Sequence, residues 1–193
     1  MITEKQSYMF KLQGVDLNKT REKDDFYVTP RIAVDKLLEV EKFNGNIWEC
    51  ACGDGAISKV LIENNYSVYS SDLFERGYGD SHINFLTTRK EVDNIVTNPP
   101  FSLSQKFVEH AFLNATKKVV ILNKLSFLEG KRRKEMFSKY PLKKVLVFSS
   151  RIPVNKKYII PLLDKKFKGN SLMAFAWFIW DKGYKGKPYI EWI

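Results

Sequence analysis

The sequence is poor in the residues that build metal sites, disulfide frameworks and membrane spans. Only two cysteines and two histidines occur in 193 residues. Cys50 and Cys52 are separated by one residue, a spacing at which a disulfide would be strained and a metal ion would lack further ligands. The apolar run at 173–180 is far shorter than the roughly 20 residues that cross a bilayer. We therefore expect no metal and no membrane span, and a cytoplasmic protein, since charged residues stand near the N-terminus where a signal peptide is apolar.

Positive charge is concentrated in one part of this chain, whose net charge is +10. Residues 124–170, the basic segment, contain 14 Lys and Arg against 3 Asp and Glu, a net of +11, whereas the rest of the chain has 18 basic and 19 acidic residues. Aromatic residues are interleaved with these charges. The segment matches the electrostatic footprint of a phosphate-backbone binder, so we predict a nucleic acid partner, with a merely solvated face as the alternative.

The hydrophobic pattern predicts strands that alternate with helices. A chain with 44% hydrophobic residues at this length buries one sizeable core, so we expect a polar arm, 1–25, and a single domain, 26–193. Strands are predicted at 46–51, 66–71, 93–97, 118–122, 144–149 and 173–181, and helices at 30–43, 56–64, 103–114 and 130–139. This alternation indicates a doubly wound, mostly parallel sheet. The last two strands lack a clear helix of about ten residues between them, so we expect one antiparallel strand at the edge of the sheet.

The predicted strand ends carry the candidate binding residues, because ligands of such sheets bind at the carboxyl ends of the strands. Cys52-Gly53-Asp54-Gly55 follows the first strand. Its glycines allow a sharp turn and a close ligand approach, and the next helix offers its N-terminal amides. Asp72, 17 residues after Gly55, can accept hydrogen bonds from ribose hydroxyls. Because the third glycine of a dinucleotide fingerprint is absent, this pair indicates an adenosine-containing ligand without a pyrophosphate.

The tetrad Asn98-Pro99-Pro100-Phe101 ends the predicted strand 93–97. The Asn98 amide oxygen and the Pro99 carbonyl can accept two hydrogen bonds from one amino group. Phe101 offers a flat apolar face on which a planar base can stack. The alternative for an isolated tetrad of this kind is a proline-rich loop that ends a strand.

These residues together resemble the S-adenosylmethionine-dependent amino-methyltransferases, and most closely the DNA adenine-N6 methyltransferases. The Asp/Asn/Ser-Pro-Pro-Tyr/Phe/Trp signature of that family corresponds to the Asn98 tetrad, and its glycine-rich cofactor loop to Cys52–Gly55. Its Phe-x-Thr-Pro element corresponds to Tyr27-Val28-Thr29-Pro30. The local pattern predicts a second role for Thr29, as the N-cap of a helix whose first residue is Pro30.

The resemblance implies a Rossmann-like, seven-stranded methyltransferase fold and S-adenosyl-L-methionine as cofactor. Asp72 would bind the ribose, and Asn84 and Phe85 would border the cofactor adenine, although the family commonly has Asp where Asn84 stands. The implied cofactor-binding residues are Tyr27, Thr29, Pro30, Cys52, Gly53, Asp54, Gly55, Asp72, Asn84 and Phe85. The implied catalytic residues are Asn98, Pro99, Pro100 and Phe101.

The implied reaction is methyl transfer to the exocyclic N6 amino group of adenine in DNA, with the base rotated out of the duplex and stacked on Phe101. Candidate phosphate contacts are Phe127, Lys131, Arg132 and Arg133. Three alternatives stay open: an RNA adenine methyltransferase, a protein glutamine N-methyltransferase, and a non-catalytic nucleic-acid-binding module. By resemblance alone we expect a bacterial or phage enzyme; we expect a monomer, with a dimer as the alternative.

Overall fold

A computed structural model describes residues 26–150, 152 and 173–193 of the protein. The predicted arm, 1–25, and residues 151 and 153–172 of the basic segment lie outside the described residues. The strands are β1 (Ile47–Glu49), β2 (Val68–Ser70), β3 (Val92–Thr97), β4 (Ala115–Lys124), β5 (Lys144–Val147), β6 (Phe175–Asp181) and β7 (Tyr189–Trp192). The helices are α2 (Arg31–Val40), α3 (Ala56–Glu63), α4 (Ser104–Asn114), the 3-10 helix η2 (Leu125–Leu128) and α5 (Lys131–Lys139).

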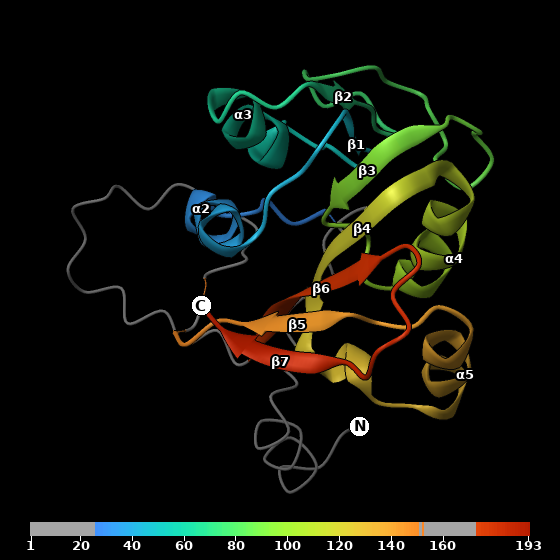
Figure 1. Ribbon diagram of the computed structural model, residues 1–193. Helices are drawn as coiled ribbons and strands as arrows, with labels where there is room; N and C mark the ends of the chain where they lie inside the picture. The colour runs from blue at the N-terminus through green and yellow to red at the C-terminus, as the bar shows by residue number, and fades with distance from the viewer. Residues whose placement is uncertain (1–25, 151, 153–172) are drawn as a thin grey trace, which may run out of the picture.

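The strands form one seven-stranded sheet in the order β2-β1-β3-β4-β6-β5-β7, with helices on both of its faces (Figure 1). Strands β1 to β4 are parallel to one another, and β6 runs antiparallel to both β4 and β5. Helices α2 and α3 contribute to the core on one face, and α4 and α5 to the core on the other. The predicted doubly wound, mostly parallel seven-stranded fold is confirmed.

Strand β6 joins the two cores because residues 175–180 are all buried. Its alternate side chains enter opposite cores: Trp177 packs on the α2 and α3 side, and Trp180 on the α4 and α5 side. A continuous apolar run is typical of a strand that is covered on both faces. The aromatic residues of this run therefore fill the core on both faces of the sheet.

The antiparallel strand lies inside the sheet and not at its edge, so that part of the prediction is wrong. Strand β5 pairs on the outer side of β6, and β7 then pairs in parallel with β5 to form the edge. The pattern did not predict β7 because Tyr189, Ile190 and Trp192 are all exposed, which leaves the strand without a buried face. An edge strand of this kind is fixed by its backbone pairing rather than by burial of its side chains.

The indole of Trp177 ties β6 to α2, and we expect it to contribute measurably to stability. Its Nε1 donates a 2.8 Å hydrogen bond to the Ala33 carbonyl inside the core. Trp177→Phe should lower the free energy of unfolding by about 2–3 kcal/mol, because it removes this bond and leaves a small cavity. Urea unfolding measures the change. The matched control is Trp192→Phe, which should change stability by less than about 0.5 kcal/mol since that side chain is 70% exposed; equal losses in both variants would contradict the role of Trp177.

No helix in the part of the chain that the structure describes is long and apolar enough to cross a bilayer. No group of three or more His, Cys, Asp and Glu side chains in residues 26–150, 152 and 173–193 is placed to hold a metal ion.

Candidate active site

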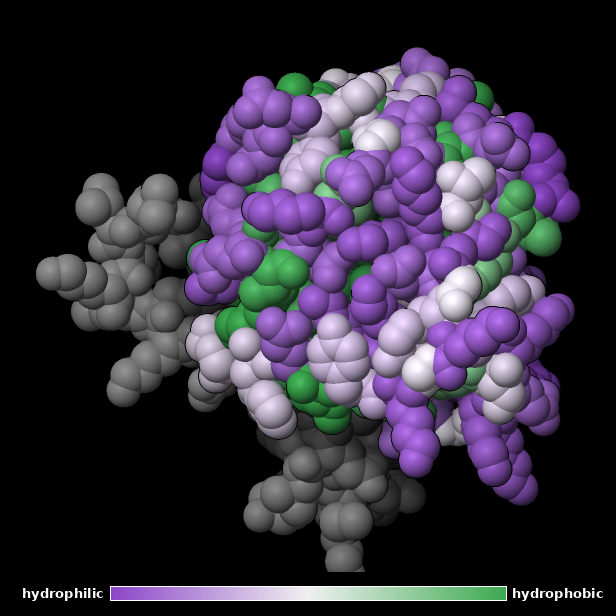
Figure 2. Space-filling model, in the orientation of Figure 1, coloured by the Kyte–Doolittle hydropathy of each residue, from purple (hydrophilic) through white to green (hydrophobic). Residues whose placement is uncertain are grey.

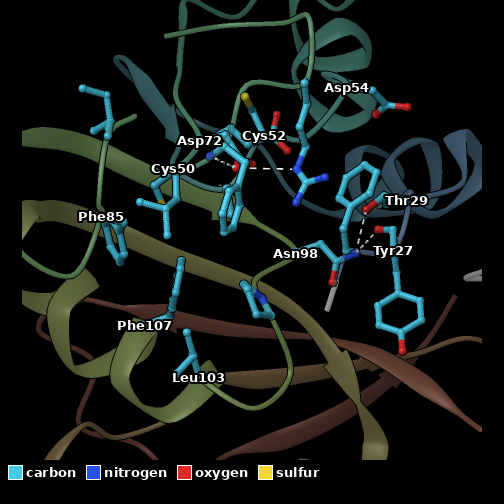
Figure 3. A pocket seen from close by; sticks show the side chains of 18 of the residues that line it. Tyr27, Thr29, Cys50, Cys52, Asp54, Asp72, Phe85, Asn98, Leu103 and Phe107 are labelled. Carbon is cyan, nitrogen blue, oxygen red and sulfur yellow. Dashed lines mark hydrogen bonds and ion pairs between the residues drawn. The ribbon is translucent and has the colours of Figure 1, made fainter. Parts of the chain in front are cut away.

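A cavity of about 430 Å³ lies at the carboxyl ends of β1, β2 and β3 (Figure 3). Its wall is formed by residues 26–29, by the turn after β1, by the segment after β2 and by the loop after β3. Of the residues predicted from the sequence, those that line it are Tyr27, Thr29, Cys52, Asp54, Asp72, Asn84, Phe85, Asn98 and Pro100. Parallel strands therefore bring segments that are distant in sequence to one site, as the positions of the motifs predicted.

The side-chain amide of Asn98 is held in a fixed orientation. Its Nδ2 donates to the Tyr27 carbonyl at 3.1 Å and to Thr29 Oγ1 at 3.0 Å (Figure 3). Its Oδ1 is buried and has no hydrogen-bond partner among the described residues. A buried acceptor without a partner costs free energy unless a ligand completes it. Asn98 thus presents an oriented acceptor at the cavity wall.

Thr29 does not cap helix α2, so this part of the prediction is wrong. Pro30 is the N-cap residue, and no side chain caps the helix there. The hydroxyl of Thr29 instead accepts the Asn98 hydrogen bond, and the side chain is buried. The segment that resembles the Phe-x-Thr-Pro element therefore positions the tetrad as well as lining the cavity.

Phe101 lies in an aromatic cluster beside the cavity and does not line it. The Tyr27 ring stacks on it with centroids 5.3 Å apart and planes at 26°, and the Phe175 ring lies at 5.6 Å. Lys124 Nζ lies 4.9 Å from the Phe101 centroid. Because Tyr27 covers one face of Phe101, a base that stacks on this face would have to take the place of the Tyr27 ring.

The turn after β1 needs glycine at both predicted positions. Gly53 has φ +56° and Gly55 has φ +81°, in the left-handed region that side chains disfavour. A Cβ at Gly53 would also collide with the Phe26 ring, and one at Gly55 with the Tyr78 ring. The predicted sharp turn is confirmed, and in this structure aromatic rings occupy the space beside both glycines.

Asp72 connects this turn to the segment after β2. Its Oδ2 accepts the Gly53 N–H at 2.9 Å, and its Oδ1 accepts the Phe74 N–H at 2.9 Å. Arg76 Nε lies 3.7 Å from Oδ1. Since each carboxylate oxygen has more than one acceptor site, these contacts leave capacity for ligand hydroxyls. Sequence reasoning missed Arg76, which lies four residues after the acid.

Glu49, at the end of β1, is a second residue that sequence reasoning left without a role. It is buried at the cavity wall and accepts hydrogen bonds from the Ser58 N–H at 2.7 Å and from the Ser58 hydroxyl. Burial raises the pKa of its carboxyl to about 8, against the lowering effect of the two Ser58 hydrogen bonds. The sequence feature that could have revealed it is an acidic residue inside a predicted buried strand.

The two cysteines also line the cavity, but their thiols are poorly suited to act as nucleophiles. Burial raises the pKa of the Cys52 thiol to about 12 and that of Cys50 well above its ordinary value. Because the thiolate is the nucleophile, both side chains are poor candidates for covalent catalysis.

The candidate phosphate contacts divide into two groups. Phe127 is 3% exposed and packs on Phe137 and Phe178, so a role for it in contacting nucleic acid is wrong. An aromatic residue among charges suggested an exposed ring, but η2 turns it into the core. Arg133 donates to the Ser126 carbonyl at 2.7 Å and stacks on Phe127, so its side chain has a local structural role. Lys131 and Arg132 are exposed at the start of α5. Much of the surface over α5 is hydrophilic (Figure 2).

Comparison with known proteins gives a likeness of fold. No family model and no curated protein matches the sequence. The methyltransferase subunit of a type I restriction-modification system from Streptococcus thermophilus matches with a TM-score of 0.62 and 12% identity, over 97% of this chain and 51% of that one. A protein described as an RNA methyltransferase from Pyrococcus horikoshii matches with a TM-score of 0.59 and 15% identity, over 94% and 97%.

A third structure, the magnesium protoporphyrin IX methyltransferase from Synechocystis PCC 6803 with bound S-adenosylmethionine, has a TM-score of 0.52 and 10% identity, over 78% of each chain. The chain spans about half the length of the restriction-modification subunits that it matches. At these identities the likeness shows the fold, which is the Rossmann-like fold of methyltransferases.

Proposed function

We propose that the protein is an S-adenosylmethionine-dependent methyltransferase that acts on the N6 amino group of adenine in DNA. The observation that carries this proposal is the Asn98 side chain, whose nitrogen is anchored by Tyr27 and Thr29 and whose buried oxygen has no partner among the described residues. An acceptor prepared in this way suits an amino group that must be held for reaction.

The cavity fits the proposed cofactor in size and in chemistry. About 430 Å³ lies within the range of small-molecule sites. Asp72, which lines the cavity, would accept hydrogen bonds from ribose hydroxyls, and Ile83, Asn84 and Phe85, which also line it, would border the adenine ring. When bound, S-adenosylmethionine would supply an electrophilic methyl group on a sulfonium. The methyltransferases of similar fold support this assignment.

The residues of the tetrad would prepare the amine for attack. The lone pair of an exocyclic amine on adenine is delocalised into the ring, which makes the amine a poor nucleophile. Asn98 Oδ1 and the Pro99 carbonyl would accept its two N–H groups and hold the lone pair toward the methyl group. Phe101 would stack on the base after extrusion from the duplex, which is required because a paired base cannot reach the site. No nucleophilic cysteine is needed for this reaction.

The direct test supplies methyl-labelled S-adenosylmethionine with duplex DNA, single-stranded DNA or RNA, and identifies the labelled nucleoside after digestion. We expect labelled N6-methyldeoxyadenosine from a DNA pool. Label only in the RNA pool would replace DNA by RNA as substrate. Cofactor binding without label in any pool would contradict a nucleic acid substrate and direct the search to glutamine amides in proteins, whereas absence of cofactor binding would leave a non-catalytic binding module.

We also predict that the start of α5 contacts nucleic acid backbone. Lys131→Ala with Arg132→Ala should weaken binding and reduce the slope of log K against log salt by about 2. Each lost phosphate contact lowers the number of counterions released on binding by about one. Fluorescence anisotropy with labelled DNA at several salt concentrations measures this slope. Lys185→Ala with Lys187→Ala removes the same charge from another exposed segment and is the control. Equal slopes in the two double variants would contradict the proposed position of the interface.

A further inference from the structure

Trp192 is the exposed one among the four tryptophans of the chain. Trp48, Trp177 and Trp180 are completely buried, whereas Trp192 is 70% exposed. Ile190, two residues before it on the edge strand β7, is 52% exposed. The proposed function gives neither residue a role. Because a large apolar ring is unfavourable in water, an indole that the fold does not bury is a candidate contact for a partner.

The pairing of β7 places Ile190 and Trp192 on the same face of the sheet. They lie beside Val145 and Val147 of β5, whose side chains pack in the core on the α4 and α5 side. Paired residues of neighbouring strands point to the same face. The two exposed residues therefore continue this apolar face onto the last strand of the sheet (Figure 1).

Trp192 stands at the same end of the sheet as the candidate active site. Strands β3, β4, β5 and β7 run in one direction, so their carboxyl ends meet at one edge. The order of the sheet puts β7 four strands away from β3. At about 4.8 Å for each step between neighbouring strands, Trp192 is about 20 Å from the tetrad along this edge. A nucleic acid strand can cover that distance with about six nucleotides at about 3.4 Å each.

The charges around Trp192 suit a polyanion. Strand β5, which pairs with β7, belongs to the basic segment with its net charge of +11. Glu191 is the single acidic residue of β7, and its Oε2 lies 3.2 Å from Lys144 Nζ. The negative charge next to Trp192 is therefore compensated, and phosphate groups can approach this edge without strong repulsion.

A second copy of the chain fits this edge less well than a nucleic acid does. In the antiparallel pairing of two β7 strands that sets Ile190 opposite Trp192, the two Glu191 residues also stand opposite each other. Like charges in that arrangement destabilise a sheet. The net charge of +10 on each chain adds a further repulsion. A nucleotide, by contrast, offers a flat base to the indole and brings a phosphate of the opposite sign.

We propose that Trp192 stacks on a base that flanks the target adenine and so forms a second binding point on the nucleic acid. This inference rests on the proposed function, because it takes the substrate to be a nucleic acid. The contact favours a single strand, since the bases of a duplex are already stacked on each other. Every base has a flat face, so the contact adds affinity without adding sequence recognition.

Tryptophan fluorescence reports on this contact, since the other three indoles are completely buried. The protein is titrated with single-stranded DNA that has one adenine and about six thymines on each side. We expect emission to fall on binding in the unsubstituted protein and to stay unchanged in Trp192→Leu. Anisotropy of the labelled DNA should show that Trp192→Leu binds about 5- to 100-fold more weakly, the range for a base stacked on an aromatic side chain. The slope of log K against log salt should not change, because Trp192 carries no charge.

The matched control is Tyr189→Leu, which removes a ring that is 45% exposed at the amino end of the same strand. It should leave the change in emission and the affinity as they are in the unsubstituted protein. DNA with about two thymines on each side is too short to reach Trp192, so Trp192→Leu should bind it without loss. Equal affinities of Trp192→Leu and the unsubstituted protein for the longer DNA would overturn the proposal, and so would equal losses for both lengths.

Sedimentation of the protein without nucleic acid tests the other occupant of this edge. A dimer of the unsubstituted protein that Trp192→Leu abolishes would mean that a second copy covers β7, and would overturn the stacking contact. Failure of the unsubstituted protein to bind any nucleic acid would overturn the substrate of the proposed function itself. Nucleic acid binding that Trp192→Leu leaves unchanged would remove the stacking contact alone, so the two failures are distinguishable.

Discussion

Asn98→Ala should lower the rate of methyl transfer by at least about 100-fold while the affinity for S-adenosylhomocysteine stays close to that of the unsubstituted protein. The substitution removes the Oδ1 acceptor proposed to hold the substrate amine, and it leaves Asp72 and the turn after β1 in place. The rate is measured in single turnovers with the methyl-labelled cofactor, so that product release does not hide the chemical step. Binding is measured separately by calorimetry.

The control for Asn98→Ala is Thr29→Val. That substitution removes one of the two acceptors of Asn98 Nδ2 but keeps the Asn98 oxygen in the site. We expect a loss of no more than about tenfold, since the Tyr27 carbonyl still orients the amide. Losses of the same size in both variants would assign the effect to the shape of the loop. A rate for Asn98→Ala equal to that of the unsubstituted protein would refute the role of the amide oxygen.

The fold was predictable because its buried segments have distinct patterns. Strands such as 93–97 are short apolar runs that end in polar or glycine-rich turns, and helices such as 56–64 keep an apolar face. The run 175–180 also carried the information that β6 is an interior strand, because a strand with two covered faces needs apolar residues at successive positions. What the pattern could not specify was the edge strand β7, whose residues are mostly exposed and whose place depends on pairing with β5.

The site was predictable only where backbone topology brings the residues together. Asp72 and Asn98 follow parallel strands, so a correct sheet is sufficient to place them at one end of it. Arg76 follows no strand directly, and its position depends on packing against Phe26 and Phe74, for which the sequence contains no periodic signal. The prediction that Phe127 contacts nucleic acid was wrong for a related reason. Its burial depends on the turn made by η2, which a count of neighbouring charges does not predict.

Glu49 gives the second large expected effect, a dependence of stability on pH. Burial raises the pKa of its carboxyl to about 8 in the folded protein, whereas an ordinary glutamic acid titrates near 4.5. Between these values the folded state holds a proton that the unfolded state has released. The free energy of unfolding contributed by this group is therefore highest below pH 4.5 and is lost as the pH rises to about 8. The full change is on the order of 5 kcal/mol, a large share of the stability of a typical domain.

Glu49→Gln should remove this dependence, because glutamine does not titrate and its amide oxygen can still accept the Ser58 hydrogen bonds. Urea unfolding at pH 5, 6, 7, 8 and 9 should give a free energy that falls with pH in the unsubstituted protein and a flatter curve in Glu49→Gln. Glu91→Gln, at an exposed position, should follow the unsubstituted protein. Parallel curves for the Glu49→Gln and unsubstituted proteins would mean that the Ser58 hydrogen bonds outweigh desolvation. Glu49 would then be a carboxylate at neutral pH, and the cavity would carry a further negative charge beside its proposed cationic cofactor.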